Sequence, residues 1–251
     1  MNLGEELIKA ISPHNLFNIK IFGLSIPVTD TVLTTWLVMA FLILAAFLLT
    51  RNMKMVPQGR QNVVECVVEL INNFVKSNIG HHWRPFSGYL GTVLLFLVFA
   101  NIISIFNVIP SAEDLYRLTG LAFFEKMPSY AIRPPTRDIN VTLCLALMSI
   151  LVTLFSGIII KRPKAWLKSF VEPVPVIAPF KVLDYFIRPT SLCFRLFGNI
   201  LGAFIIMELI IIVMPVILPA ALSIYFDLFD GALQSYVFVF LTSIYIAEAI
   251  E

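Results

Sequence analysis

Charged residues are scarce in this chain of 251 residues: Asp, Glu, Lys and Arg make up 14% of it, whereas 59% is hydrophobic. Together with a mean hydropathy of +0.89, these proportions exclude both an ordinary soluble domain and a disordered chain. The net charge of +2 is small, and no block of Lys or Arg occurs, which argues against nucleic acid as a partner. The composition predicts a polytopic membrane protein.

Sequence motifs of metal and covalent chemistry are missing as well. The chain has three Cys and three His without CxxC or zinc-site spacing, so we expect neither a metal nor a cofactor. It contains no GxxxxGK phosphate loop, no HExxH and no GxSxG. We interpret Cys66, Cys144 and Cys193 as small core residues. Residues 1–27 lack the basic-then-apolar pattern of a signal peptide.

Long uncharged runs predict an all-α membrane protein with about five transmembrane helices in a single membrane domain. Residues 31–50, 89–109 and 138–160 are each long enough to cross about 30 Å of hydrocarbon. Residues 61–79 place apolar side chains at helical spacing between Glu, Asn and Lys, which predicts an amphipathic helix at the interface or against another helix. The last third, residues 180–214 and 220–250, predicts two helices that are too long to stand upright and therefore form a strongly tilted hairpin.

The distribution of Lys and Arg predicts the orientation. Residues 51–88 and 161–181 hold ten of these cations, whereas residues 1–30 and 109–138 hold six. Because cytoplasmic segments are enriched in Lys and Arg, we expect the N-terminus outside and the C-terminus in the cytoplasm.

Arg195 lies within a nearly uncharged apolar stretch of the tilted hairpin. Placing a guanidinium at the centre of a bilayer costs from roughly 2.5 to well over 10 kcal/mol. Arginine does not deprotonate in proteins, so it does not escape this cost by becoming neutral. Arg195 therefore requires a partner charge or water at that depth.

Further polar residues predict an ion pathway beside this arginine. Folding the hairpin about residue 217 places Glu208 beside Asp227, and Gln234 beside Asn199. Asp227, Asp230 and Gln234 follow one another at spacings of three and four residues, which predicts a stripe on one helix face. The alternatives are that an aspartate caps the last helix and that Gln234 bonds between helices; the combination with Arg195 favours a proton or cation relay.

The second and third spans also carry candidate pathway residues. Asn101, Ser104 and Asn107 interrupt the second span, and Asp138 and Asn140 begin the third. Hydrogen bonding between helices is as good an explanation of the first three as a water pathway. An N-cap alone explains Asp138.

Three motifs resemble subunit a of the F-type ATP synthase: PTSLCFRLFGN (189–199), QSYVFVFLTSIY (234–245) and PPTRDINVTL (134–143). The resemblance extends over about residues 85 to 250. It implies a non-catalytic subunit that conducts protons, with Na⁺ as the alternative ion, through two offset half-channels so that ion flow drives rotation. Its partners would be the c-subunit ring, b-type peripheral stalk subunits and the lipid bilayer, most simply a bacterial inner membrane.

The resemblance also implies a role for each matching residue. Arg195 would face the c-ring, attract its deprotonated carboxylates and keep the half-channels from short-circuiting, with Asn199 and Gln234 as polar neighbours. Asp227 and Glu208 would line the outer half-channel. Phe204 departs from the family, which often has Glu or His there. The hairpin places Phe204 level with Asp230, so we infer that Asp230 and Glu208 supply the missing titratable site.

A second departure concerns Ser104, which stands where relatives can carry a carboxylate. The route through the second span is therefore left open. The rival function is a secondary transporter that binds an anionic substrate at Arg195, but no second, inverted half is found. An intramembrane enzyme lacks its motifs. Copurification with a small multi-copy hairpin protein separates the synthase from the transporter.

Overall fold

A computed structural model describes residues 15–21, 24–51, 53–103, 134–171, 178–213 and 217–251. Its contacts divide the chain into two compact units, which are described separately. Unit 1 comprises residues 1–40, 97–138 and 197–233, and unit 2 comprises residues 41–96, 139–196 and 234–251. Four of the five boundaries between the units lie inside helices, and the fifth, between Asp138 and Ile139, lies at the start of α7.

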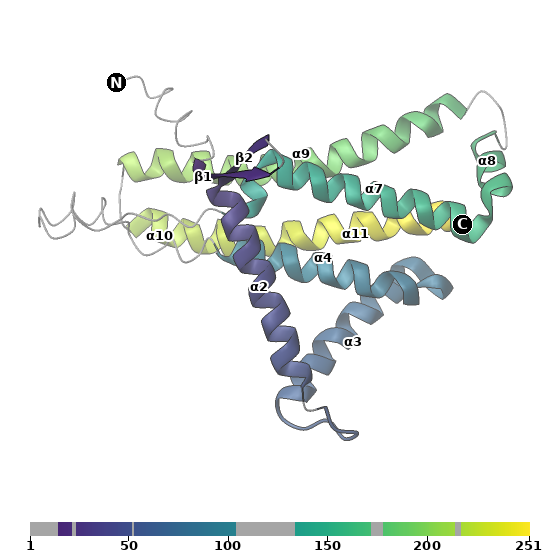
Figure 1. Ribbon diagram of the computed structural model, residues 1–251, viewed down its shortest axis with the longest axis horizontal. Helices are drawn as coiled ribbons and strands as arrows, with labels where there is room; N and C mark the ends of the chain where they lie inside the picture. The colour runs from purple at the N-terminus through teal and green to yellow at the C-terminus, as the bar shows by residue number, and fades with distance from the viewer. Residues whose placement is uncertain (1–14, 22–23, 52, 104–133, 172–177, 214–216) are drawn as a thin grey trace, which may run out of the picture. The chain divides into compact units, whose positions relative to one another are not determined.

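The described elements alternate long helices with short segments (Figure 1). In chain order they are β1 (Asn15–Ile21), β2 (Leu24–Thr29), α2 (Asp30–Thr50), α3 (Arg60–Ile79), η1 (Gly80–His82), α4 (Arg84–Ile102), η3 (Pro135–Arg137), α7 (Ile139–Lys161), α8 (Pro163–Val171), α9 (Ala178–Val213), α10 (Ile217–Ser223), the π-helix η5 (Ile224–Asp230) and α11 (Gly231–Ile250).

Within the described residues, five helical segments are long and apolar enough to cross a membrane: Asp30–Thr50, Arg84–Ile102, Ile139–Lys161, Ala178–Met207 and Ala221–Ile250. The prediction of an all-α polytopic membrane protein with long final helices is confirmed. The chain is an integral membrane protein. The short helix α8 and the π-helix η5 were not predicted. Neither was a β1–β2 hairpin whose strands pair antiparallel, with Phe17 opposite Val28.

In unit 1, the hairpin leads directly into α2 (Figure 1). The carboxylate of Asp30 accepts a hydrogen bond from the backbone N–H of Thr31 (2.9 Å), which satisfies one of the unpaired donors of the first helical turn. The hydroxyls of Thr29 and Thr31 bond to each other at 2.8 Å. Val28 is buried beside them, so the end of β2 and the start of α2 share one small core.

Unit 2 packs helices through small and hydroxyl side chains. Ser149 on α7 bonds to Thr242 on α11 at 2.9 Å, and both are buried. Asn78 at the end of α3 donates to Ser243 at 3.0 Å. Hydrogen bonds of this kind join helices where lipid offers no polar partner. Only the last turns of α3 contribute buried apolar residues, namely Ile71, Val75 and Ile79.

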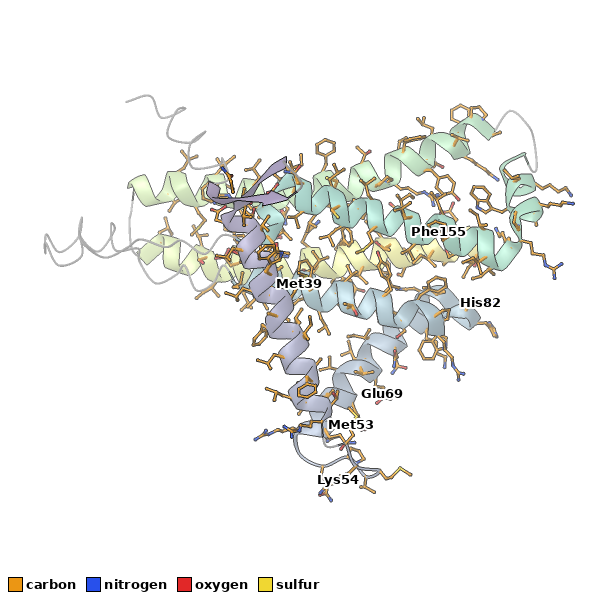
Figure 2. The ribbon with its side chains drawn as sticks, in the orientation of Figure 1. Met39, Met53, Lys54, Glu69, His82 and Phe155 are labelled. Atoms are coloured by element: carbon orange, nitrogen blue, oxygen red, sulfur yellow. The ribbon has the colours of Figure 1, made fainter. Side chains whose placement is uncertain are left out.

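The remaining helix surface is rich in exposed apolar side chains, such as Met39 on α2 and Phe155 on α7 (Figure 2). An apolar solvent removes the penalty for such exposure, as expected for helices in a bilayer. The cysteine prediction is correct for Cys193, which is buried, and wrong for Cys66 and Cys144, which are exposed. A thiol on an outer helix face is tolerated for the same reason.

Candidate functional site

Arg195 lies midway along α9, on its exposed face. It makes no hydrogen bond or ion pair with any side chain that the structure describes. The helix keeps its course through Pro189, so the guanidinium is carried on one continuous element. The sequence argument required a partner for this charge, and the described part of the chain offers none.

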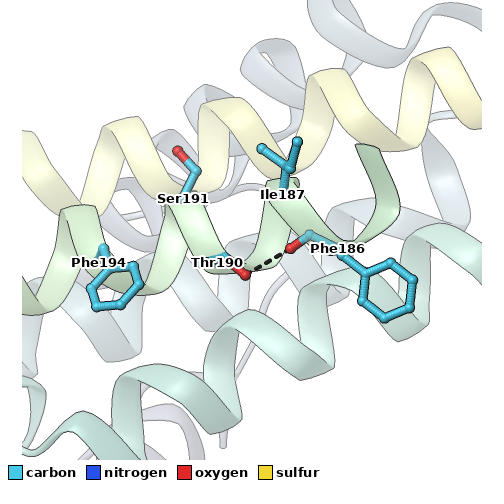
Figure 3. Close-up of a pocket in the computed structure, with 5 residues that line it drawn as sticks. All are labelled: Phe186, Ile187, Thr190, Ser191 and Phe194. Carbon is cyan, nitrogen blue, oxygen red and sulfur yellow. Dashed lines mark hydrogen bonds between the residues drawn. The ribbon is translucent and has the colours of Figure 1, made fainter. Parts of the chain in front are cut away.

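An open cavity of about 370 Å³ lies on the same face, one turn toward the start of α9. Its lining is mostly apolar and comprises Phe186, Ile187, Thr190, Ser191 and Phe194 (Figure 3). The Thr190 hydroxyl donates to the Phe186 carbonyl at 2.7 Å, so Ser191 carries the only other hydroxyl among these five lining residues. The face beside Arg195 is therefore suited to an apolar neighbour, either lipid or another helix.

Beyond Arg195, α9 continues with two glycines that have room around them. A Cβ added at Gly198 or Gly202 would meet no atom of the described chain within 4 Å. Neither glycine is needed for packing within this chain. The small side chains instead leave the helix surface open to a close neighbour.

In unit 1, the structure brings Asn199 and Asp230 together. The amide Nδ2 of Asn199 donates to Oδ2 of Asp230 at 2.6 Å. The hairpin folded about residue 217 had placed Asp230 level with Phe204, so the predicted register is wrong by five residues. The predicted register assumed two regular α-helices, whereas α10 and a π-helix that ends at Asp230 form this part of the chain.

The π-helix also separates Asp227 from Asp230. Asp227 accepts a hydrogen bond from the hydroxyl of Ser223 in the preceding turn, whereas Asp230 faces α9. A π-turn closes i→i+5 bonds and is wider than an α-turn, so residues three apart are turned further from each other than in an α-helix. The single stripe of carboxylates stays a prediction.

A second polar group in unit 1 joins three segments of the chain. Asn101, which is 3% exposed, donates from Nδ2 to the Gly231 carbonyl at 3.0 Å and accepts from the Thr136 hydroxyl at 2.6 Å. Asp138 accepts from the Thr31 hydroxyl at 3.0 Å. Asn101 thus bonds to neighbouring elements, as the alternative interpretation of the second span had it, and Asp138 bonds to the first turn of α2.

Arg137 is a buried charge that the sequence argument did not single out. Its side chain is 9% exposed, and its Cζ lies 3.4 Å from the centroid of the Phe204 ring. A guanidinium over an aromatic face gains a cation–π attraction that is larger when desolvated. Its signal in the sequence was an arginine next to Asp138; the aromatic departure at Phe204 now has a contact that explains it.

Five predicted site residues remain. Gln234, in unit 2, is 5% exposed, and its Nε2 has no hydrogen-bond partner in the described part of the chain. Asn140, also in unit 2, is exposed in the first turn of α7. The Glu208 side chain, Ser104 and Asn107 lie outside the described residues. The described residues hold no group of three or more His, Cys, Asp or Glu that could bind a metal ion.

Comparison with known proteins identifies the family of this chain. The family model described as "ATP synthase A chain" matches residues 32–247. The chain belongs to this family. A relative, "ATP synthase subunit a, sodium ion specific" of Propionigenium modestum, is 34% identical over 224 residues, which cover 89% of this chain and 75% of the relative.

Membership in the family settles the choice between the two functions considered for Arg195. The chain is an ion-translocating subunit of an ATP synthase and not a secondary transporter of an anionic substrate. The described geometry fits this function, because it holds an uncompensated arginine on an outward face and carboxylates that are hydrogen-bonded to amides and hydroxyls.

Proposed function

We propose that Arg195 meets the carboxylates of a rotating c-ring and divides an ion path into two offset half-channels. The observation that carries this proposal is the exposed guanidinium without a described partner. A charge in hydrocarbon must be compensated. If the compensation does not come from this chain, it comes from a neighbouring subunit, and a passing ring carboxylate supplies it transiently.

The apolar cavity and the glycines on α9 support the proposal that the c-ring docks on the face of α9 that carries Arg195. Ring helices present an apolar surface of their own, and the lining from Phe186 to Phe194 matches it in chemistry. Gly198 and Gly202 leave space for close approach. Arg195 would then favour the ionised form of each carboxylate that arrives, which releases the ion on one side and permits reloading on the other.

The outer half-channel is proposed to run through the polar residues of unit 1. Asp227 and Asp230 supply titratable oxygens, and Asn199 is bonded to the second of them. Glu208 and Asp138 extend the series. Asn101, Ser104, Asn107, Asn140 and Gln234 complete the set as hydrogen-bonding neighbours of the path.

The ion is proposed to be H⁺, with Na⁺ as the second candidate because the printed name of the relative is sodium-specific. The subunit would work with the c-ring and b-type peripheral stalk subunits in a bacterial inner membrane, with its N-terminus outside. No step of covalent chemistry falls to this chain. Ion flow turns the ring, and the chemistry of the nucleotide belongs to other subunits.

The test is Arg195→Ala in the intact complex, with ATP-driven ion pumping and passive leak followed in vesicles with and without Na⁺. We expect driven pumping to be lost, because the ring carboxylate has no cation to meet. Arg84→Ala is the matched control, since Arg84 is an exposed arginine at the start of α4. Unaltered pumping in Arg195→Ala would overturn the proposal. Dependence of pumping on Na⁺ would replace H⁺ by Na⁺ as the ion.

A further inference from the structure

An ion pair in unit 2 joins α9 to the end of α11. Nη2 of Arg188 lies 2.7 Å from Oε1 of Glu248, and the Arg188 side chain is 17% exposed while that of Glu248 is 60% exposed. The guanidinium also lies over the ring of Tyr245, with Cζ 4.8 Å from its centroid. Two residues of α11, one turn apart, thus hold one arginine of α9.

Arg188 occupies a particular position relative to Arg195. It lies seven residues earlier on the same helix, which is close to two turns and about 10 Å. Residues at this spacing lie on nearly the same side of a helix. Two residues that line the cavity are close to these arginines in the sequence: Ile187 directly precedes Arg188, and Ser191 lies between Arg188 and Arg195. A bare Arg188 would therefore offer a second cation to any carboxylate that moves along this side of α9.

We propose that Glu248 masks the charge of Arg188, so that a ring carboxylate on the cytoplasmic side meets Arg195 and not a second bare arginine. This inference rests on the proposed function of Arg195. In the proposed orientation, the start of α9 and the end of α11 are cytoplasmic, so the ion pair stands beside the inner half-channel. Glu248 is a positioning residue in this scheme and never touches the transported ion.

Loss of the masking charge should shift the pH dependence of proton uptake in one direction. A cation near a carboxylate favours its ionised form. Without Glu248, a ring carboxylate near Arg188 would take a proton from the cytoplasmic side only at lower pH. ATP-driven pumping loads protons on that side, so pumping is the direction that suffers. Among the described side chains, Arg188 pairs with the Glu248 carboxylate, and the Tyr245 ring lies against the same guanidinium.

The experiment uses inverted vesicles with the whole ATP synthase, in which the cytoplasmic face meets the medium. ATP-driven pumping is measured against the pH of the medium for Glu248→Gln, Arg188→Gln and the double variant. For Glu248→Gln we expect the pH profile to move toward acid by about one unit, the effect of one more charge at about 10 Å in a partly polar medium. The double variant is expected to keep the wild-type profile, because it removes both charges of the pair. Arg188→Gln removes the cation and leaves the Glu248 carboxylate, so it is expected to give no acid shift.

The matched control is Glu251→Gln, which removes an exposed carboxylate three residues further on and should leave the profile in place. A merely structural ion pair would change the amount of assembled complex, which is measured in the same membranes, but not the pH profile of what assembles. If Glu248→Gln does not accumulate, Glu248→Asp keeps the charge on a shorter side chain and is expected to give a smaller acid shift.

An unshifted profile in the available Glu248 variant, or an equal shift in the double variant, overturns the inference. Arg195→Ala in the same vesicles separates this failure from that of the proposed function. Loss of pumping there, combined with an unshifted Glu248 profile, rejects only the masking of Arg188. Intact pumping in Arg195→Ala rejects the proposed function and the masking together.

Discussion

Three arginines of this chain differ in the contacts that compensate their charge. Arg137 lies over the Phe204 ring, and Arg188 pairs with Glu248. Arg195 has neither kind of support among the described side chains. Since an uncompensated charge is costly in a bilayer, two of these arginines are stabilised within the chain, and the third is left ready for a group from outside. Arg195 is distinguished by what it lacks.

The two aspartates of the π-helix and its boundary should differ in their effect on ion uptake. We expect Asp227→Asn to slow passive proton flux through the membrane sector several-fold, and Asp230→Asn to slow it less. The reason is that Glu208 on α9 is proposed to share the role of Asp230, whereas Asp227 has no proposed substitute. The measurement is proton flux into vesicles from which the catalytic sector has been removed, at a series of outer pH values.

The control for this pair is Asp184→Asn, which removes an exposed carboxylate near the opposite, starting end of α9 and should leave outer uptake unchanged. If neither Asp227→Asn nor Asp230→Asn slows the flux, the proposed outer pathway through these carboxylates is wrong. A larger effect of Asp230→Asn would place the main uptake site at its hydrogen bond with Asn199.

At the scale of elements, the membrane spans were predictable because they depend on local properties. An uncharged run of 20 residues is sufficient to indicate a spanning helix, and α2 and α7 begin and end within one residue of the expected ranges. The apolar pattern of α10 and the π-helix is also continuous. Over seven residues, however, that pattern is the same for i→i+4 and i→i+5 hydrogen bonding, so the change of register at Asp230 was not predictable.

Contacts between elements were harder to predict than the elements. No local pattern indicates that α8 places Trp166 against Gly157, where an added Cβ would lie 2.9 Å from Nε1 of Trp166. The same holds for Phe204, whose partner Arg137 is far away in the chain. Which helices meet depends on packing over long sequence separations, and no spacing within one helix encodes it.

Helix packing in unit 1 yields a prediction at Gly231. A Cβ at this position would lie 2.9 Å from Cβ of Asn101, and the Gly231 carbonyl accepts the Asn101 amide. We expect Gly231→Ala to cost about 1–3 kcal/mol through overpacking, offset by less than about 1 kcal/mol of improved helix propensity. The measurement is the thermal stability of the purified complex, together with its content of this subunit.

Gly88→Ala is the control for that variant, because a Cβ there meets nothing within 4 Å and Gly88 also lies inside a helix. It should be neutral or slightly stabilising through helix propensity alone. Equal stability of Gly231→Ala and Gly88→Ala would contradict the expected overpacking between α4 and the start of α11.

For the molecule as a whole, the predicted site residues are distributed over both units. Arg195 and Gln234 belong to unit 2, whereas Asn199, Asp227 and Asp230 belong to unit 1. Reasoning from the sequence ordered these residues along two helices and assigned their chemistry, but the partners that they have in space required the structure. The helices also expose a large apolar surface, which lipid and other subunits, and not this chain, would cover.

Orientation is the property of the whole molecule that the charge pattern predicts. More Lys and Arg lie in the segments proposed as cytoplasmic, so the N-terminus should be outside and the C-terminus inside. In a chain whose three cysteines are replaced by serine, we expect Asn18→Cys, exposed in β1, to react with a membrane-impermeant maleimide in spheroplasts. Glu251→Cys, exposed at the other end, should react only in inverted vesicles. The opposite pattern would reverse the assignment of the outer and inner half-channels, and with it the side on which Glu248 acts.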